Sequence, residues 1–203
     1  MSDCLVHVID DDAAIRDALI LLLTADGLTV EAHDSADAFL DRLDSLPSGC
    51  VITDVQMPGM TGLELLSRLR PRAREFPIIV LTGQADVPMA VEALRNGALD
   101  LVEKPFESAS LLETVRRALA RRSEAQALES AKVEIAERLQ SLSSREREVL
   151  EGVVAGGSNK EVARTLAISP RTVESYRANI MMKMRASSLS ELVRMTLLAT
   201  AAD

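Results

Sequence analysis

The chain has 203 residues, 47% of them hydrophobic and 2% aromatic, with a formal net charge of −8, so it is long enough for one or two domains with an aliphatic core. No apolar stretch approaches the roughly 18 residues that a membrane span needs, and the N-terminal residues do not have the pattern of a signal peptide. The two cysteines, Cys4 and Cys50, do not have the spacing of metal ligands. These features argue against a membrane-spanning protein, an exported one and a cysteine metal site, and we expect a reduced, cytoplasmic protein in which both cysteines are buried.

Residues 1–122 alternate between short apolar segments typical of strands and segments with helical periodicity. The expected strands are 5–9, 28–32, 50–54, 77–82 and 99–103, and the expected helices are 13–25, 36–45, 62–70, 87–96 and 108–122. Strict alternation predicts an α/β fold with a doubly wound, five-stranded parallel sheet covered on both faces. We expect the strand order 2-1-3-4-5, with the less apolar second strand at an edge, and helix-ending glycines at Gly27 and Gly97.

Three adjacent aspartates, Asp10, Asp11 and Asp12, follow the first expected strand. Two carboxylates about 4 Å apart repel by about 4 kcal/mol at an effective dielectric near 20, so this crowding needs a reason. A helix cap accounts for one of the three. A solvated strand end is the plain alternative, and this stretch alone does not decide between them.

The other strands also lead into polar residues. Asp54 closes the third strand, Thr82 closes the fourth, and Lys104 follows the fifth. With strands one and three at the switch point, Asp10, Asp11 and Asp54 are expected to converge, with Thr82 and Lys104 on the far rim. Such carboxylates need a cation, and Mg²⁺ suits their oxygens. Asp54 is then a candidate nucleophile that forms an aspartyl phosphate, stabilised by the metal, by the Lys104 ammonium and by the Thr82 hydroxyl.

The segments VIDDD, DVQMPGMTG, LTG and EKPF resemble the receiver domain of bacterial two-component response regulators, over about residues 3–122. The resemblance implies phosphotransfer to Asp54 from a sensor histidine kinase, with Mg²⁺ or Mn²⁺ as cofactor. The metal ligands implied by motif position are Asp11 and Asp54 directly, the Gln56 carbonyl, and Asp10 through water. The resemblance also leaves Asp12 as the helix cap and makes Lys104–Pro105 a candidate cis peptide.

Leu101 departs from the receiver pattern, because it occupies the position that usually holds an aromatic switch residue. The coupling of Thr82 to the face formed by the fourth helix, fifth strand and fifth helix is therefore open. An aspartyl-phosphate phosphatase of the haloacid-dehalogenase type is a second hypothesis. Such an enzyme needs an acid/base Asp two residues after the nucleophile, where this chain has Gln56, so we expect a phosphoacceptor and not an enzyme.

Residues 123–140 form the expected linker. They contain no Gly or Pro and favour a helix that continues the fifth one. Leu128, Ile135 and Leu142 are spaced seven apart, so a short coiled-coil contact stays open beside the linker interpretation.

Residues 141–203 are entirely helical in pattern. Ser143 or Ser144 is placed to cap a helix that stops at Gly156–Gly157, NKEVARTL follows, and Ser169–Pro170 begins the next helix after a tight AIS turn. Two helices joined by so short a turn predict a helix-turn-helix, whose second helix enters the major groove. A helical dimerisation unit is the alternative, but residues 158–185 carry 6 basic and 2 acidic side chains.

Residues 142–194 resemble the DNA-binding domain of the LuxR class, and the order of the two modules resembles the FixJ/NarL family, closest to its FixJ branch. The outward face of the expected recognition helix carries candidate base contacts at Arg171, Glu174, Ser175, Ala178 and Asn179, with Met182 beside them. The candidate phosphate contacts are Lys160, Thr172, Arg177 and Lys183.

Together the two modules predict a transcriptional response regulator that binds promoter DNA as a homodimer once it is phosphorylated. Contact with RNA polymerase is a further option, and no membrane partner is expected. A phosphorylation-dependent adaptor that does not bind DNA is the third hypothesis, against which the basic window 158–185 argues.

Overall fold

The structure is a computed structural model that describes residues 4–83 and 87–200. The chain divides into two compact units, an N-terminal unit, Met1–Gln126, and a C-terminal unit, Ala127–Asp203. Within the described residues, no helix combines the length and the apolar character needed to cross a bilayer.

A five-stranded sheet organises the N-terminal unit. Its strands are β1 (Leu5–Ile9), β2 (Thr29–His33), β3 (Cys50–Asp54), β4 (Ile78–Thr82) and β5 (Asp100–Glu103). All neighbouring strands pair in parallel in the order β2-β1-β3-β4-β5. The predicted fold class, strand order and edge position of the second strand are therefore confirmed. β1, β3 and β4 are buried along their whole length, as expected of strands covered on both faces.

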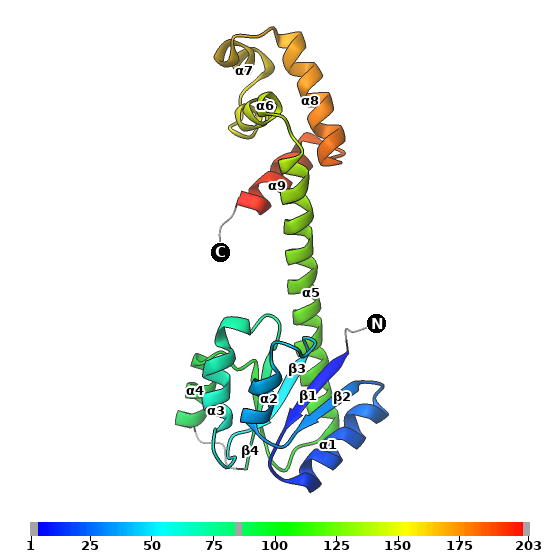
Figure 1. Cartoon of the computed structure of the whole chain (residues 1–203), viewed down its shortest axis with the longest axis vertical. Coiled ribbons are helices and arrows are strands. Elements are labelled where there is room, and N and C mark those ends of the chain that lie inside the picture. Colours follow the sequence, from blue (N-terminus) through cyan, green and yellow to red (C-terminus); the bar gives the residue numbers. More distant parts are fainter. Residues whose placement is uncertain (1–3, 84–86, 201–203) are drawn as a thin grey trace. The chain divides into compact units, whose positions relative to one another are not determined.

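Helices cover both faces of this sheet (Figure 1). The helices are α1 (Ala13–Ala25), α2 (Ala36–Arg42), α3 (Gly62–Leu69), the short 3₁₀ helix η1 (Arg70–Arg72), α4 (Val87–Arg95) and α5 (Ser108–Gln140). One apolar core lies under α2, α3 and α4, around Phe39, Leu65 and Phe76. The other lies under α1 and α5, around Leu23 and Leu111.

The element boundaries follow the local chemistry of the chain. Asp12 caps α1 by accepting a hydrogen bond from the backbone N–H of Ala14 at 2.8 Å, as predicted. Gly27 and Gly97 have φ of +83° and +99°, in the left-handed region where glycine is favoured. α2 is shorter than expected, because hydrogen-bonded turns replace the helix from Leu43 onward.

The two cysteines have different surroundings. Cys50 is fully buried, and burial raises the pKa of its thiol to about 12, so it stays protonated at neutral pH. Cys4 is exposed, and its predicted burial is wrong, because Cys4 lies in a turn just before β1 and outside the strand.

The chain's two histidines form a pair inside the N-terminal unit. His7 on β1 is 0% exposed and His33 on β2 is 5% exposed, and both pack against Phe39. The Nε2 atom of His7 lies 2.9 Å from the carbonyl oxygen of Pro47, so it donates, and the neutral Nδ1 atom accepts from His33 Nε2 at 3.3 Å. Burial lowers the pKa of both rings, that of His33 to about 4.

The C-terminal unit is entirely helical across its described residues. After the end of α5 come α6 (Ser144–Val154), α7 (Asn159–Leu166), α8 (Pro170–Met184) and α9 (Leu189–Thr200). Three residues, 167–169, join α7 to α8, and Ser169 caps α8 with Pro170 in its first position, as predicted. Val149, Val173 and Met184 lie at the centre of the core that these helices share.

Helix α5 continues without a break through residues 123–140. Ile135 and Leu142 of the seven-residue series are buried in the core of the C-terminal unit, whereas Leu128 is exposed. Two of the three positions considered for a coiled coil therefore serve packing within the chain.

Candidate functional site

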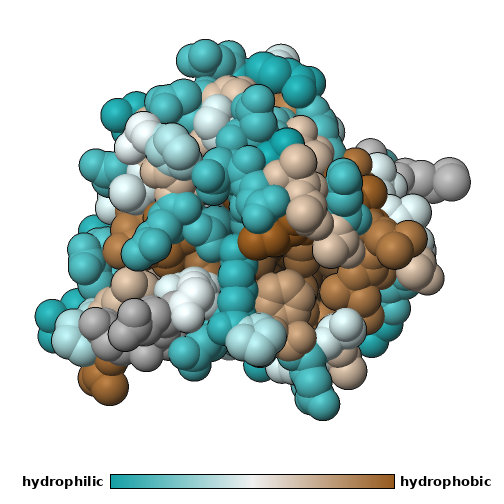
Figure 2. Space-filling model, turned by 90° about the horizontal axis from the view of Figure 1, so that it is seen from below, coloured by the Kyte–Doolittle hydropathy of each residue, from teal (hydrophilic) through white to brown (hydrophobic). Residues whose placement is uncertain are grey.

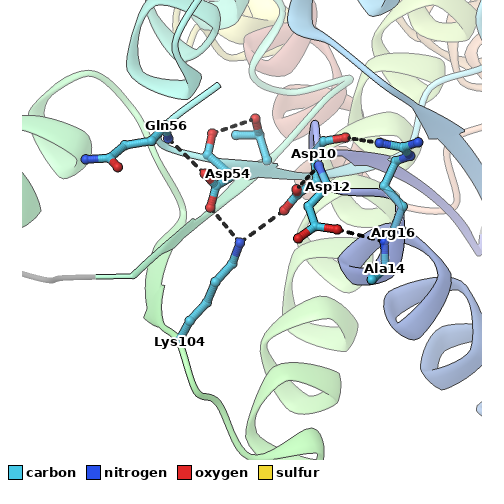
Figure 3. Close-up of polar contacts among 8 residues, drawn as sticks. Asp10, Asp12, Ala14, Arg16, Asp54, Gln56 and Lys104 are labelled. Carbon is cyan, nitrogen blue, oxygen red and sulfur yellow. Dashed lines mark hydrogen bonds and ion pairs between the residues drawn. The ribbon is translucent and has the colours of Figure 1, made fainter. Parts of the chain in front are cut away.

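A lysine ammonium group lies between two buried carboxylates at the carboxyl ends of the strands (Figure 3). The Nζ atom of Lys104 is 2.7 Å from Oδ1 of Asp54 and 3.0 Å from Oδ2 of Asp10. Asp10 is 2% exposed and Asp54 is 8% exposed. The parallel sheet brings these three residues together, because Asp10 follows β1, Asp54 closes β3 and Lys104 follows β5. Figure 2 shows the molecule of Figure 1 from below. Hydrophilic and hydrophobic residues are mixed on this face.

The backbone after β3 holds the Asp54 side chain in place. The N–H of Gln56 donates to Oδ2 of Asp54 at 2.9 Å, which leaves Oδ1 to Lys104. Gly62 begins α3 against the same strand, and its N–H donates to the Val55 carbonyl at 3.0 Å. A Cβ atom on Gly62 would lie 2.1 Å from the Asp54 carbonyl oxygen, so only glycine allows this approach.

Asp10 is fixed by neighbours that follow it in sequence. Its Oδ1 atom accepts from the N–H of Asp12 at 2.9 Å, and its carbonyl oxygen accepts from Arg16 at 2.7 Å (Figure 3). It was not predicted from the sequence that Arg16 holds the Asp10 backbone. The only feature of the sequence that could have indicated it is the position of Arg16 in the first turn of the helix that follows Asp10. Asp11 is exposed beside these residues.

Electrostatics keep Lys104 charged. Burial alone would lower the pKa of its ammonium group, but hydrogen bonds and charge from Asp54 and Asp10 outweigh burial and raise it. The Lys104 N–H donates to the Thr82 carbonyl at 2.7 Å, and the Lys104–Pro105 peptide is cis, as predicted. The site therefore carries a permanent positive charge beside a buried carboxylate.

Thr82 closes β4 on the rim of the site and is buried. Its hydroxyl group donates to the sulfur of Met89 on α4 at 3.6 Å. Met89 and Leu101 pack, half-buried, against the same core. Leu101 thus lies among aliphatic and methionine side chains, at the position where the receiver pattern that the sequence resembles has an aromatic ring.

The donor set fits a hard divalent cation in part. Asp10 and Asp54 converge on one ammonium group, and Mg²⁺ commonly takes one or two carboxylates together with carbonyl and water oxygens. Among the described residues, however, no three His, Cys, Asp or Glu side chains lie close enough together to form a metal-binding group. Asp11 stands apart from such a cluster, and Lys104 is the cation in contact with both carboxylates.

Helix α8 in the C-terminal unit presents the second predicted site. The side chains named for its outward face are all exposed, namely those of Arg171, Glu174, Ser175, Ala178, Asn179 and Met182. Lys160 on α7 is exposed as well, and Thr172 is half-buried with its hydroxyl 2.7 Å from that of Ser169. This face can therefore reach a ligand without rearrangement of the helices.

Two of the predicted phosphate contacts are also engaged inside the unit. Arg177 donates to the Asn159 side chain at 2.5 Å and so joins α8 to the start of α7. Lys183 donates to Glu146 at 2.7 Å and joins α8 to α6. Glu146 also accepts from the Ser143 N–H, and these bonds, led by that of Lys183, lower the pKa of its carboxyl group.

Two family models match most of the chain. The model for the response regulator receiver domain matches residues 6–116, and the model for the bacterial regulatory proteins of the luxR family matches residues 140–196.

Relatives match over nearly the full length. The chain is 54% identical over 194 residues to the transcriptional regulatory protein FixJ of Azorhizobium caulinodans, covering 96% of this chain and 92% of that one. It is 41% identical to the response regulator protein TodT of Pseudomonas putida, over 97% and 87% of the two chains. Among solved structures, full-length FixJ from B. japonicum is 49% identical in sequence, covers 100% of both chains and has a TM-score of 0.61. The structure of the response regulator StyR is 35% identical, covers 95% of this chain and 97% of that one, and has a TM-score of 0.81.

Proposed function

This chain belongs to the FixJ-type two-component response regulators, which join a receiver domain to a LuxR-type DNA-binding domain, and from that premise we propose that its phosphoacceptor is Asp54. As a member of this family the chain is a DNA-binding transcriptional regulator and a phosphoacceptor, not an enzyme. A sensor kinase and DNA are its partners.

The contact between Lys104 and Asp54 is the observation that carries the proposal. An Asp54 carboxylate oxygen attacks the phosphorus of a phosphohistidine on the sensor histidine kinase. The P–N bond breaks as the O–P bond forms, and the imidazole leaves with the electron pair. The Lys104 ammonium group then neutralises charge on the phosphoryl oxygens, and the Thr82 hydroxyl group donates to one of them after leaving Met89.

We propose Mg²⁺ or Mn²⁺ as the cofactor of this site. Asp10, Asp11, Asp54 and the Gln56 carbonyl would hold it, and it would supply further positive charge to the phosphoryl oxygens. Asp10 is already directed at the same point as Asp54. The exposed side chain of Asp11 must turn toward that point to become a ligand.

Labelling with acetyl phosphate tests the phosphoacceptor. With Mg²⁺ present, Asp54→Asn should abolish the acyl phosphate seen by intact-protein mass spectrometry, because an amide is a poor nucleophile. Asp12→Asn is the matched control, because Asn caps a helix as well as Asp does and labelling should persist. Full labelling of Asp54→Asn would refute the assignment.

The DNA contacts and the dimer form the second part of the proposal. The exposed face of α8 enters the major groove, where Arg171, Glu174, Ser175, Ala178 and Asn179 meet base edges. Lys160, Thr172, Arg177 and Lys183 meet phosphates, the last two while they also hold α8 to its neighbours. Phosphorylation promotes homodimerisation and promoter binding in the cytoplasm, and contact with RNA polymerase is open to the bound dimer.

Promoter binding by the phosphorylated chain tests this second part. Affinity should fall steeply with salt, and Arg171→Ala should weaken it by about tenfold, in line with the loss of one bidentate contact. Arg145→Ala on α6 is the control, because Arg145 is exposed and paired with Glu148. Equal affinities of the two variants would argue against α8 as the recognition helix, and absence of binding at any salt would favour an adaptor.

We keep the proposed modules as a receiver over 1–122, a helical linker over 123–140 and a DNA-binding domain over 141–203. The division of the chain after Gln126 falls inside this linker. The burial of Ile135 among the C-terminal helices indicates that the linker also contributes to the packing of the DNA-binding domain.

A further inference from the structure

Helix α4 is attached to the N-terminal unit by few buried side chains. Of its nine residues, all of them described, Ala93 alone is buried. Helix α3 is one residue shorter, yet it buries four residues, namely Gly62, Leu65, Leu66 and Leu69. An element with few buried contacts shifts at a low cost in free energy. A single contact between α4 and the sheet therefore has a large influence on where this helix lies.

The Thr82 side chain points toward the layer that contains α4. Side chains alternate between the two faces of a strand, so Thr82 lies on the same face of β4 as Val80. Val80 is paired with Leu101 on β5, and both pack in the core under α2, α3 and α4, as Met89 does. The Thr82 hydroxyl donates to the Met89 sulfur at 3.6 Å. Because Met89 lies in the first turn of α4, this bond joins the rim of the phosphoacceptor site to the helix.

Met89 offers Thr82 an interaction that Leu101 does not. The leucine side chain has no polar atom, so it forms no hydrogen bond with the Thr82 hydroxyl. A thioether sulfur is a weak acceptor on a flexible side chain. A phosphoryl oxygen on Asp54 is charged and is therefore the stronger acceptor. The sulfur thus holds the hydroxyl at rest and gives it up at a small cost when a phosphoryl group arrives.

We propose that Met89 is the positioning residue through which Thr82 acts on α4. In the unphosphorylated chain the Met89 sulfur keeps the Thr82 hydroxyl on the α4 side. When Asp54 carries a phosphoryl group, the hydroxyl turns to a phosphoryl oxygen, and the first turn of α4 loses this bond to β4. The inference rests on the proposed function, because it requires Asp54 as phosphoacceptor and Thr82 as a donor to the phosphoryl group.

The bond between Thr82 and Met89 therefore opposes activation. A contact that is present only in the resting state must be broken before the active state forms, so its removal shifts the equilibrium toward the active state. A replacement of Met89 that keeps its volume and removes the acceptor should strengthen the binding of a phosphoryl group or its mimic. A side chain that only fills space would weaken binding on replacement or leave it unchanged, so the direction of the effect distinguishes the two roles.

Titration of the full chain with beryllofluoride in the presence of Mg²⁺ tests the direction. Beryllofluoride coordinates to a carboxylate oxygen and has the tetrahedral shape and the charge of a phosphoryl group. Met89→Leu should bind it about threefold more tightly than the wild type, the size of one weak neutral hydrogen bond. Met60→Leu is the matched control, because it makes the same replacement in the same core but outside α4, and it should bind as the wild type does.

A double-mutant cycle with Thr82→Val assigns the effect to the hydroxyl. Valine keeps the shape of threonine and removes the donor, so it weakens beryllofluoride binding in any background. If the sulfur acts through the hydroxyl, Met89→Leu should have no further effect in the Thr82→Val protein. A threefold gain that persists without the hydroxyl would show that Met89 acts in another way, and would overturn the inference.

Nuclear magnetic resonance of the full chain shows whether α4 responds. The ε-methyl resonance of Met89, assigned by its loss in Met89→Leu, should shift when beryllofluoride binds the wild type. The amide resonances of Val91 and Leu94 on α4 should shift with it. In Met89→Leu without ligand these amides should already lie part of the way toward their bound positions. Amides that stay at the unbound positions of the wild type would contradict a resting bond that holds α4.

The outcomes separate this inference from the phosphoacceptor proposal. If the wild type binds beryllofluoride and Asp54→Asn does not, the phosphoacceptor proposal stands. Equal or weaker binding by Met89→Leu than by Met60→Leu would then overturn the role of Met89 alone. A wild-type chain that neither binds beryllofluoride nor forms an acyl phosphate would overturn the phosphoacceptor proposal and this inference with it.

Discussion

The ammonium group of Lys104 lies 2.7 Å from Oδ1 of Asp54, although the two residues are 50 positions apart in sequence. The same group reaches Asp10 at 3.0 Å. Lys104 thus offsets part of the negative charge of the two buried carboxylates before any phosphoryl group arrives, and its removal should expose their mutual repulsion.

Replacing Lys104 with Met should lower the free energy of unfolding of the N-terminal unit by about 3 kcal/mol, because two buried carboxylates lose their counter-charge. Millimolar Mg²⁺ should restore part of this loss in urea unfolding followed by circular dichroism. Lys160→Met, at an exposed position on α7, serves as the control and should change little. A Lys104→Met protein as stable as the wild type would show that the carboxylates do not need this partner.

Replacing Gly62 with Ala should destabilise the N-terminal unit by about 3 kcal/mol and impair labelling of Asp54, because the added methyl group collides with the Asp54 carbonyl oxygen. Gly83→Ala is the comparison for stability, because a Cβ atom on Gly83 meets nothing within 4 Å. Melting curves of the two variants give the answer, and equal melting temperatures would contradict the close approach of α3 to β3.

The histidine pair should make the N-terminal unit sensitive to acid. Burial is the largest cause, and the charge of His7 the second, of a lowering of the pKa of His33 from 6.5 to about 4. Between pH 6.5 and 4, therefore, His33 binds a proton in the unfolded chain but not in the folded one. Stability is therefore lost as the pH falls from 6.5 to 4, by up to about 3 kcal/mol from this group.

His33→Gln removes this titration and can retain a donor toward His7. We expect a flatter dependence of the unfolding free energy on pH in this variant than in the wild type, measured between pH 7 and 4. Parallel curves for the two proteins would mean that His33 titrates normally in the fold.

Replacing Glu146 with Gln should destabilise the C-terminal unit by about 1 kcal/mol, because Lys183 and the Ser143 N–H lose a charged acceptor. Glu148→Gln is the control two positions later, where an exposed ion pair with Arg145 contributes little. Thermal unfolding of both variants distinguishes a packing role of Glu146 from a general effect of surface charge.

The sequence was informative where strand ends carry charge. Asp10, Asp54 and Lys104 could be placed together because parallel strands deliver their carboxyl ends to one edge, and caps such as Asp12 and Ser169 depend only on local chemistry. Strand order and the helix-turn-helix followed from the same patterns.

Long-range partners of single side chains could not be predicted in this way. The contact of Thr82 with Met89, the pairing of His7 with His33 and the bond of Lys183 to Glu146 join elements whose packing no periodicity specifies. The exposure of Cys4 shows a similar limit, because the residue directly before a buried strand can be exposed although the strand itself is predicted correctly.

The interior position of both imidazoles has a consequence for signal flow. The chain has two histidines, and each ring is enclosed by aromatic neighbours and hydrogen-bonded within the fold. A ring that hands a phosphoryl group onward must meet another protein at the surface. Neither imidazole of this chain is therefore placed to accept a phosphoryl group, so a histidine that exchanges this group with Asp54 belongs to another protein.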